Sequence, residues 1–240
     1  MIDYLALTQE LERVFTPRLA LRPIALSDAW PLFQATRNPD FNKHLLWEQP
    51  DNELLVLDRV NTIVESARRG RLSAMSAVLK STGEWVSLYR FQPSANDAKT
   101  AEMGIWTSDK FWNGRFSLEL TRACIDAAFT LSEVSSLIGG ASPYNRSSCK
   151  LLEFCGLTLF TTCIRHSETF VEVPAQEFRI TRQQWREKCL ETAFEQVPFE
   201  NIAEPRESDP ESSLRSEVPF IRSSASNRPF PSEPHDSAAA

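Results

Sequence analysis

The sequence predicts a mixed α/β domain in which antiparallel strands come first and strand–helix units follow. Three observations lead to this fold class. Alternating apolar and polar residues mark a strand near the N-terminus, a hairpin pattern lies mid-chain, and later strands are separated by amphipathic helices. Hairpins make antiparallel neighbours, whereas strands joined through a helix can lie parallel. We therefore expect one mixed sheet with helices packed against it.

The composition limits the class of protein. The chain has 240 residues, of which 42% are hydrophobic and 24% charged, as in an ordinary globular protein. Its formal net charge of −6 argues against binding to nucleic acids or anionic membranes, because both attract positive surfaces. No run approaches the ~18 apolar residues of a membrane span, and the N-terminus lacks a signal-peptide core. The five cysteines lack metal-site spacing, so we expect free thiols, no bound metal and a cytoplasmic location.

The N-terminal end is expected to form a short helix followed by a strand. Residues 1–15 mix apolar and acidic side chains, and we interpret them as a helical extension that lies on the domain. From Arg18 to Ile24, leucines at positions 19 and 21 alternate with less apolar residues. This pattern is typical of a strand with one buried face.

Two helices follow this strand. Ser27-Asp28 is expected to cap a helix over Ala29–Thr36, whose Trp30 and Phe33 point inward. Apolar residues at helical spacing predict a second helix that ends at Gly70. This helix covers Leu54–Arg69, and its expected inward residues are Leu54, Leu57, Val60, Ile63, Val64 and Ala67.

A hairpin and alternating elements complete the predicted domain, which covers residues 16–196. Strands at Leu72–Lys80 and Glu84–Gln92 meet across Ser81-Thr82-Gly83. The elements after them are the strand Ala101–Ser108, the helix Phe116–Leu131, the strand Val134–Ala141, the helix Arg146–Cys155, a hairpin of Leu157–Arg165 and Glu168–Phe178 turning at His166-Ser167, and the helix Arg182–Glu195.

The composition changes at the C-terminal end. Residues 197–240 hold seven of the 15 prolines, nine serines and no glycine, and they show no apolar period. Such a segment buries too little apolar surface to offset its ordering entropy. We interpret it as a disordered Pro/Ser-rich tail, either inert or carrying short docking motifs.

One turn has the properties of an anion site. The apolar strand end around Phe111-Trp112 breaks at Asn113-Gly114, and the chain restarts as a helix. The first N–H groups of a helix lack intrahelical acceptors, and the helix dipole is positive at that end. The turn therefore predicts a phosphate or carboxylate ligand.

Five short pieces follow one another in a fixed order along the chain. They are Thr16-Pro17-Arg18, Glu102-Met103-Gly104-Ile105-Trp106, the Gly-containing loop after Phe111-Trp112, Asn145-x-x-Ser148 with Leu152-Glu153-x-x-Gly156-Leu157, and Ile180-Thr181-Arg182-x-x-Trp185. Their order and spacing resemble the GNAT acetyltransferases, most closely the RimJ/RimL-like branch. The resemblance runs from about Thr16 to Trp185.

The resemblance implies a fold, a reaction and a co-substrate. In this family two central strands, here Ala101–Ser108 and Val134–Ala141, splay apart, and the arm of acetyl-coenzyme A lies between them like an added strand. The family transfers an acetyl group from acetyl-coenzyme A to a primary amine by direct attack. The acceptor would be a protein N-terminus or a small amine, and the enzyme a monomer or homodimer. Ile105, Trp106 and Asn145 are then expected to contact the coenzyme.

The loop that would hold the coenzyme pyrophosphate departs from the family pattern. By resemblance it covers Asn113, Gly114, Arg115, Phe116 and Ser117. Arg115 occupies the position at which the family pattern has its first glycine. Glycine suits that place because the backbone approaches phosphates closely and can need a positive φ. Arg115 either obstructs the loop or pairs with a phosphate, and a one-residue shift would return Gly114 to the glycine position. The expected Gly-x-x-Gly of the hairpin is also missing at residues 86–89.

Three residues are candidates for proton transfer. Relatives often place a carboxylate at the position of Glu102 to deprotonate the amine through water; the alternative is a strand glutamate paired with a neighbour. Ser148 matches the serine that hydrogen-bonds or protonates the departing thiolate, or else it satisfies the helix backbone. Tyr144 is a second candidate acid. Asn145 is expected to cap the helix that carries Ser148.

The acceptor pocket is less well marked. Trp47, Tyr89 and Trp106 are candidate lining residues or plain core, and His44 is a candidate base or substrate contact without a visible orienting partner. Two other functions stay open. The altered loop favours a non-catalytic GNAT-like binding module, and the tail permits an interaction protein with the domain as its scaffold.

Overall fold

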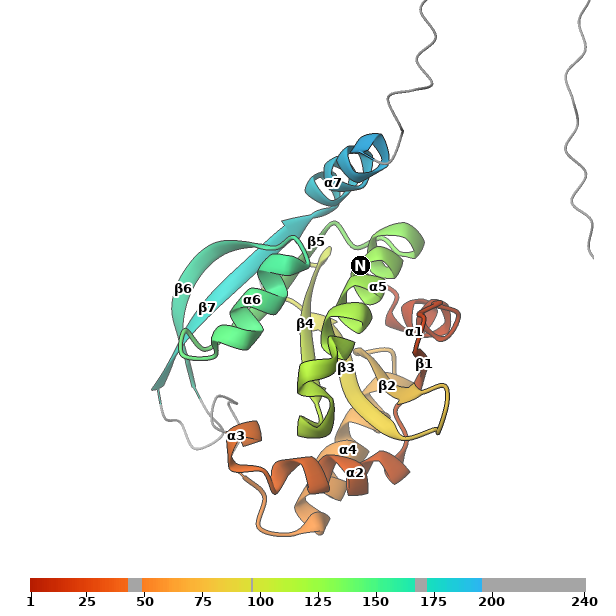
Figure 1. The fold of residues 1–240 in the computed structure, drawn as a ribbon, viewed down its shortest axis with the longest axis vertical. Helices are drawn as coiled ribbons and strands as arrows, with labels where there is room; N and C mark the ends of the chain where they lie inside the picture. Colours follow the sequence, from red (N-terminus) through yellow and green to blue (C-terminus); the bar gives the residue numbers. More distant parts are fainter. Residues whose placement is uncertain (43–48, 96, 167–171, 196–240) are drawn as a thin grey trace, which may run out of the picture. The chain divides into compact units, whose positions relative to one another are not determined.

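Seven strands form one sheet in the part of the chain that the structure describes (Figure 1). The computed structural model describes residues 1–42, 49–95, 97–166 and 172–195. The sheet order is β1-β2-β3-β4-β5-β7-β6. The strands are β1 (Leu19–Pro23), β2 (Ser73–Leu79), β3 (Trp85–Pro93), β4 (Thr100–Thr107), β5 (Ser136–Ala141), β6 (Thr158–His166) and β7 (Glu172–Thr181).

The sheet is mixed, as predicted. Every neighbouring pair is antiparallel except β4 and β5, which run parallel. The helices are α1 (Tyr4–Glu12), α2 (Ala29–Thr36), α3 (Pro39–Asn42), α4 (Glu53–Arg68), α5 (Phe116–Leu131), α6 (Arg146–Phe154) and α7 (Arg182–Glu195), with 3-10 turns η1 (Leu26–Asp28) and η2 (Asp109–Gly114). The predicted bounds of α2, α5 and α7 match the structure. The tail 197–240, His44, Trp47 and Ser167 lie outside the described residues.

Two apolar clusters occupy opposite faces of the sheet. Strand β3 contributes to both, because successive side chains of a strand point to opposite faces. Tyr89 and Phe91 join the cluster formed with α1 and α5, whereas Leu88 joins the one formed with α2 and α4. Figure 1 shows α5 in front of the central strands and α4 behind them.

Asp28 has a different role from the predicted helix cap. Its carboxylate accepts hydrogen bonds from the guanidinium of Arg22, the backbone N–H of Ala25 and the hydroxyl of Ser76. It makes no side-chain cap with α2. The buried carboxylate is better satisfied by the neighbouring strands, since a buried charge needs several partners. Its hydrogen bond with Arg22 raises the pKa of that guanidinium.

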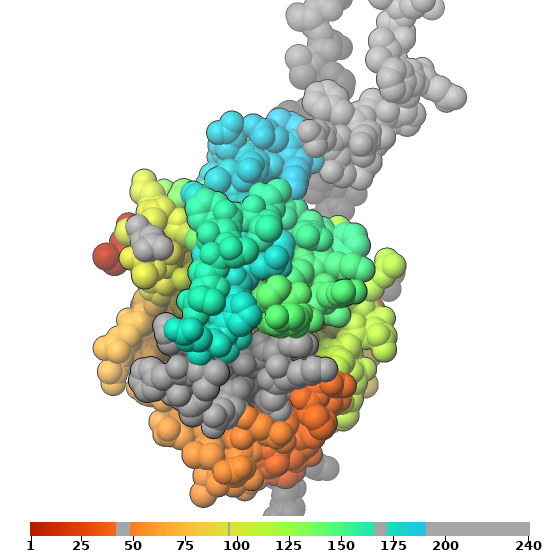
Figure 2. Space-filling view, turned by 90° about the vertical axis from the view of Figure 1, so that its left-hand side faces the viewer, coloured from red at the N-terminus to blue at the C-terminus, as the bar shows by residue number. Residues whose placement is uncertain are grey.

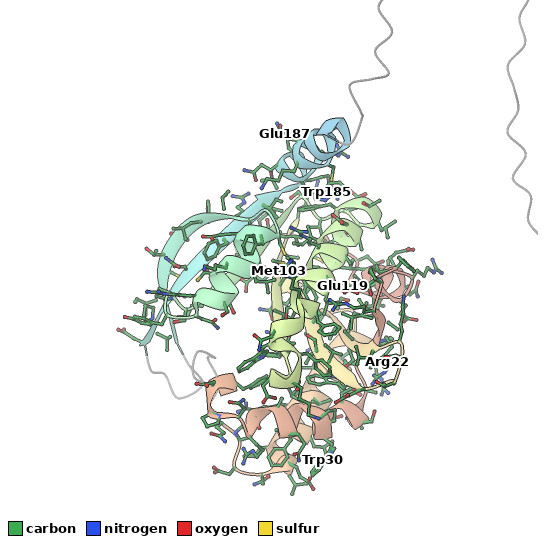
Figure 3. The ribbon with its side chains drawn as sticks, viewed as in Figure 1. Arg22, Trp30, Met103, Glu119, Trp185 and Glu187 are labelled. Carbon is green, nitrogen blue, oxygen red and sulfur yellow. The ribbon has the colours of Figure 1, made fainter. Side chains whose placement is uncertain are left out.

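Two predicted helix faces are only partly right: Phe33 and Ile63 pack against the apolar cluster as predicted, but other residues of the predicted faces do not. Trp30 is 57% exposed and points away from the sheet (Figure 3), because α2 packs through Ala29, Leu32 and Ala35 instead. On α4 the buried stripe is Val56, Val60 and Val64, so the expected inward residues Leu54 and Leu57 are exposed. Their apolar character had shifted the predicted phase of the helix. Val60 and Val64 were predicted correctly.

Long-range contacts explain why the outer motifs of the resemblance belong to this fold. Glu119 of α5 accepts hydrogen bonds from the backbone and the guanidinium of Arg18 at 2.8 and 2.7 Å. At the other end of α5, the guanidinium of Arg182 donates to the carbonyls of Phe129 and Val134. Trp185 donates to Asp126 at 2.7 Å. Hydrogen bonds thus connect helix α5 to Arg18, just before β1, at one end and to α7 at the other (Figure 3).

The five cysteines are free, as expected. Cys124 is fully buried on α5, and burial raises the pKa of its thiol strongly. Cys149 and Cys155 are only partly buried against the same cluster. Burial also raises the pKa of the Cys155 thiol, to about 12. These thiols are therefore protonated at neutral pH.

Candidate active site

Strand β4 is paired with the parallel strand β5 over only half of the length of β4. Their register runs from Thr100 opposite Ser136 to Met103 opposite Gly139, and β4 then continues to Thr107 without β5. A cavity of about 610 Å³ opens where the pairing stops. Its lining includes Gly104, Ile105 and Trp106 of β4 and residues 139–142 at the end of β5. The unpaired edge of β4 therefore faces a space that can take an extended ligand.

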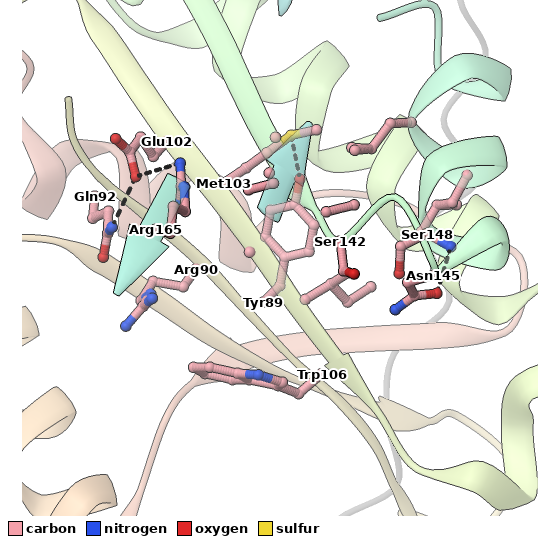
Figure 4. A pocket seen from close by; sticks show the side chains of 18 of the residues that line it. Tyr89, Arg90, Gln92, Glu102, Met103, Trp106, Ser142, Asn145, Ser148 and Arg165 are labelled. Atoms are coloured by element: carbon pink, nitrogen blue, oxygen red, sulfur yellow. Dashed lines mark hydrogen bonds and ion pairs between the residues drawn. The ribbon is translucent and has the colours of Figure 1, made fainter. Parts of the chain in front are cut away.

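One end of the cavity is polar and uncharged (Figure 4). Asn145 caps α6, and its side-chain oxygen accepts from the backbone N–H of Ser148 at 3.1 Å. Both residues line the cavity. The Ser148 hydroxyl makes none of the side-chain hydrogen bonds found within the described ranges, so its O–H is left for a ligand. Tyr144 is 73% exposed and does not line the cavity.

Arg115 adopts the conformation that glycine favours. Its φ and ψ are 57° and 20°, and it is the one described residue other than glycine with a positive φ. Gly114 does not share that conformation, so the loop has not shifted by one residue. Gly114 is required for another reason. A Cβ atom there would lie 2.4 Å from the ring of Phe116.

Two hydrogen bonds connect the loop around Arg115 to Thr107, the last residue of β4. The indole N–H of Trp112 donates to the carbonyl of Thr107 at 2.8 Å, and the hydroxyls of Thr107 and Ser117 are 2.9 Å apart. Helix α5 has no side-chain cap at its start. Its first N–H groups therefore remain available for an anion. Residues 113–117 do not line the cavity itself but follow directly from the strand that does.

The other end of the cavity is charged (Figure 4). Glu102 accepts a hydrogen bond from Gln92 at 3.2 Å and lies 3.9 Å from the guanidinium of Arg165. Arg165 also pairs with Glu177 at 2.8 Å. Although burial lowers the pKa of Arg165, its hydrogen bond with Glu177 and the nearby carboxylates raise it overall. Figure 2 shows that β6 and β7, which bring Arg165 and Glu177, share a face with α4.

Two further β3 residues complete this end. The guanidinium of Arg90 lies 5.1 Å from the centre of the Trp106 ring. Tyr89 is buried, and its hydroxyl donates to the sulfur of Met103 at 3.2 Å. Burial raises the pKa of Tyr89 well above its usual value. The phenol therefore serves as a neutral wall of the cavity.

The sequence of this chain matches one family model over residues 18–158, and that model describes an acetyltransferase (GNAT) domain. The chain belongs to the GNAT acetyltransferase family. The predicted resemblance and the predicted enzyme class are confirmed. The parallel β4–β5 pair and the cavity beside it are thus features of a GNAT domain.

Similar proteins carry related descriptions. The chain is 26% identical over 142 residues to a Bacillus licheniformis protein described as an uncharacterized N-acetyltransferase p20, covering 59% of this chain and 80% of that protein. The solved structure of RimL, a ribosomal L7/L12 α-N-protein acetyltransferase in complex with coenzyme A, matches with a TM-score of 0.61 at 14% identity, over 69% of this chain and 95% of that one. Spermidine N-acetyltransferase from Vibrio cholerae, in complex with coenzyme A and spermine, matches with a TM-score of 0.59 at 13% identity, over 70% of this chain and 98% of that one. At these identities the two structures show a shared fold.

The GNAT domain brings together five of the residues singled out from the sequence. Glu102, Ile105, Trp106, Asn145 and Ser148 all line the cavity. Tyr89 also lines the cavity and at the same time belongs to the buried core, so both alternatives given for that residue hold.

Sequence reasoning missed the arginines of the charged end. Arg90 stands in the apolar run Leu88-Tyr89-Arg90-Phe91, where a charged residue on a central strand is unusual. That signal was visible in the sequence. Arg165 gave no comparable signal, since its place beside Glu102 depends on the pairing of β6 and β7.

Two further properties concern the described residues alone. No helix among them is long and apolar enough to cross a membrane. Within the same ranges, no cluster of three or more His, Cys, Asp or Glu side chains has the arrangement of a metal site.

Proposed function

We propose that this GNAT domain transfers an acetyl group from acetyl-coenzyme A to a primary amine by direct nucleophilic attack. Acetyl-coenzyme A supplies the acetyl thioester when it is bound. The observation that carries the proposal is the cavity at the point where β4 and β5 separate, with polar groups at one end and charged groups at the other. We propose further that the acceptor is a protein N-terminus or a small amine, and that the cytoplasmic enzyme is a monomer or homodimer.

The residues around the gap fit the coenzyme. The free edge of β4 at Gly104, Ile105 and Trp106 offers backbone groups to an extended arm, and Asn145 lies across the cavity. The uncapped start of α5, from Arg115 to Ser117, offers N–H groups and a positive side chain to phosphates. The positive φ of Arg115 supports this role, because it gives the loop the backbone form expected of glycine. It also argues against a degenerate loop.

The chain supplies two proton-transfer groups. The amine must lose a proton, and we assign that proton to Glu102 through a water molecule. Gln92 and Arg165 hold this carboxylate in the cavity. The leaving sulfur needs a proton or a hydrogen bond, and the Ser148 hydroxyl at the opposite end supplies it. The acetyl group passes directly to nitrogen, so no protein nucleophile is required.

A pair of measurements tests the proposal. The thermal unfolding midpoint is measured with acetyl-coenzyme A and with desulfo-coenzyme A. Acetyl transfer is then measured with a panel of amines by release of free thiol. A ligand at 100 times its dissociation constant stabilises a protein by about 2.7 kcal/mol, so binding is easily detected. Failure of both ligands to raise the midpoint would refute the proposal, and binding without transfer to any amine would favour the binding module.

A further inference from the structure

The charged end of the cavity contains a guanidinium that forms no ion pair with any residue of the described ranges. Arg90 projects from β3 into the cavity lining, and its Nε atom is buried without a hydrogen-bond partner. In the part of the chain that the structure describes, the ion pairs of this end join Arg165 to Glu102 and Glu177, and none involves Arg90.

Burying such a donor costs free energy unless a hydrogen-bond acceptor pairs with it. A buried donor left unpaired loses its hydration without compensation, and the cost is greatest when the group is charged. Burial lowers the pKa of Arg90, with a smaller opposing effect from the charge of Glu102. An arginine side chain nevertheless stays protonated in proteins, so the positive charge remains in the cavity. An acceptor with oxygen lone pairs would satisfy it.

The surroundings hold this guanidinium in place for recognition. It stacks over Trp106, which lies on the adjacent strand β4 and also lines the cavity. Stacking on an aromatic ring restricts the guanidinium plane and leaves its edge for in-plane hydrogen bonds. Figure 4 shows Arg90 on the same side of the cavity as Glu102 and Arg165, away from Ser148 and Asn145. It therefore lies at the charged end, where the amine is proposed to react, rather than at the polar end.

We propose that Arg90 binds an oxyanion on the acceptor, so that the acetylated molecule is a primary amine that also carries a carboxylate or a phosphate. The proposal rests on the proposed acetyl transfer. Glu102 and Arg90 then form a complementary pair for a zwitterionic acceptor, with the carboxylate toward the ammonium group and the guanidinium toward the oxyanion. Planar paired hydrogen bonds to an oxyanion are the interaction that arginine makes best.

Matched acceptors test this assignment in the full-length protein. Three pairs differ in one charged group: β-alanine and β-alaninamide, O-phosphoethanolamine and ethanolamine, and two peptides that begin with Asp or Asn and are otherwise identical. They separate a small carboxylate, a phosphate and an acidic N-terminus as sources of the oxyanion. Acetyl transfer is measured as kcat/KM for wild type, Arg90→Gln, Arg90→Lys and Arg37→Gln. The Arg37 variant is a matched control, because its guanidinium stacks 4.5 Å from the Phe33 ring outside the cavity lining.

The expected result is a preference of about tenfold or more for the anionic member of at least one pair, carried mainly by KM. Arg90→Gln should abolish the preference, Arg90→Lys should keep part of it, and Arg37→Gln should leave it intact. Equal use of both members by wild type would overturn the proposal. So would a preference that survives in Arg90→Gln.

A binding measurement separates this proposal from the transfer reaction. The coenzyme-A-saturated protein is titrated with the N-acetylated form of each probe, and the thermal midpoint is recorded. Stabilisation by the anionic forms in wild type and its loss in Arg90→Gln would support the oxyanion site even if no acetyl transfer is found. The absence of a difference between anionic and neutral forms would reject it. Failure of the proposed function shows separately, as a missing midpoint shift with acetyl-coenzyme A itself.

Discussion

The two halves of the cavity use different parts of the polypeptide. At the end proposed for the coenzyme, here called the coenzyme half, the contacts available to a ligand come mainly from the backbone: the free edge of β4 in the cavity and, in the adjoining loop outside the cavity lining, the uncapped start of α5 and the turn at Arg115. At the acceptor half they come from charged side chains, with Glu102 and Arg165 paired in the cavity.

This difference implies different tolerances to substitution. A backbone site depends on conformation, so it accepts many side chains but few changes of turn geometry. A side-chain site depends on the identity of its charged residues, and replacing one leaves its partner uncompensated. The coenzyme half can therefore hold an arginine in a conformation that favours glycine, whereas each charge at the other end should matter for the proposed chemistry or specificity. Five substitutions test this contrast.

The largest effect is expected for Glu102→Gln in the acceptor half. Loss of a positioned proton acceptor should lower kcat about 100-fold while acetyl-coenzyme A binding stays unchanged. Glu177→Gln is the control, since it removes a partner of Arg165 but leaves Glu102 in place. An equal loss in both variants would contradict the assignment of Glu102.

In the coenzyme half, Gly114→Ala should destabilise the fold by about 2 kcal/mol, as expected for overpacking. The added methyl group meets the ring of Phe116, which is itself covered by the guanidinium of Arg18 at 3.9 Å. Chemical denaturation measures the change. Gly104→Ala is the control, because a Cβ there meets nothing within 4 Å. Similar stability losses in both variants would show that the close approach of the Phe116 ring to Gly114 is not the cause.

Ser148→Ala is expected to lower kcat about tenfold with little change in acetyl-coenzyme A affinity. The backbone of α6 stays capped by Asn145, so the helix itself should persist. Single-turnover rates and equilibrium binding are compared with those of Ser147→Ala, which changes an exposed neighbour in the same turn. A parallel fall in rate and affinity would identify Ser148 as a binding group rather than a proton donor.

Arg115→Gly separates conformation from charge in the coenzyme half. Glycine removes the energetic cost of the left-handed conformation, but it also raises the conformational entropy of the unfolded chain. The net gain in the free energy of unfolding should therefore be below about 1 kcal/mol. Affinity for coenzyme A should fall if the guanidinium pairs with phosphate. Arg115→Lys keeps the charge and the strain, and it should retain part of the affinity without the stability gain. A tighter complex in Arg115→Gly would show that the arginine obstructs the loop.

The smallest effect concerns Glu119, which lies outside both halves and serves as a reference. Burial raises the pKa of this carboxyl, but hydrogen bonds from Arg18 outweigh it and lower the pKa overall. A lowered folded-state pKa contributes stability above the unfolded pKa, and this contribution is lost as the pH falls through the folded value. Glu119→Gln should cost less than about 1 kcal/mol at pH 7. The difference should begin to shrink as the pH falls below the unfolded pKa of about 4.3 and should disappear only below the lowered folded pKa. Urea unfolding across this range measures it; a constant difference would exclude the ionised carboxylate as its source.

The sequence was most informative where the evidence is local. The bounds of α5 follow from the break at Asn113-Gly114 and from an apolar stripe of helical period, and both are short-range features. The same reasoning chose the wrong face for Trp30 and Leu54, because it could not see which neighbours each helix would meet. It also assigned Asp28 to a helix cap, whereas the contacts with Arg22 and Ser76 need two strands in register.

The order of elements could be predicted from the sequence by itself, because local periodicity encodes it. The resemblance of its motifs implied the family and pointed to Glu102, Asn145 and Ser148. Only the tertiary structure decided that β4 and β5 part after Met103 and that Arg115 takes the left-handed form. It also decided that Arg165 reaches Glu102 and that Arg90 Nε is buried without a hydrogen-bond partner among the described residues. These features depend on contacts between residues far apart in the chain and on the point at which the hydrogen bonding between β4 and β5 stops. Neither leaves a periodic signal in the sequence.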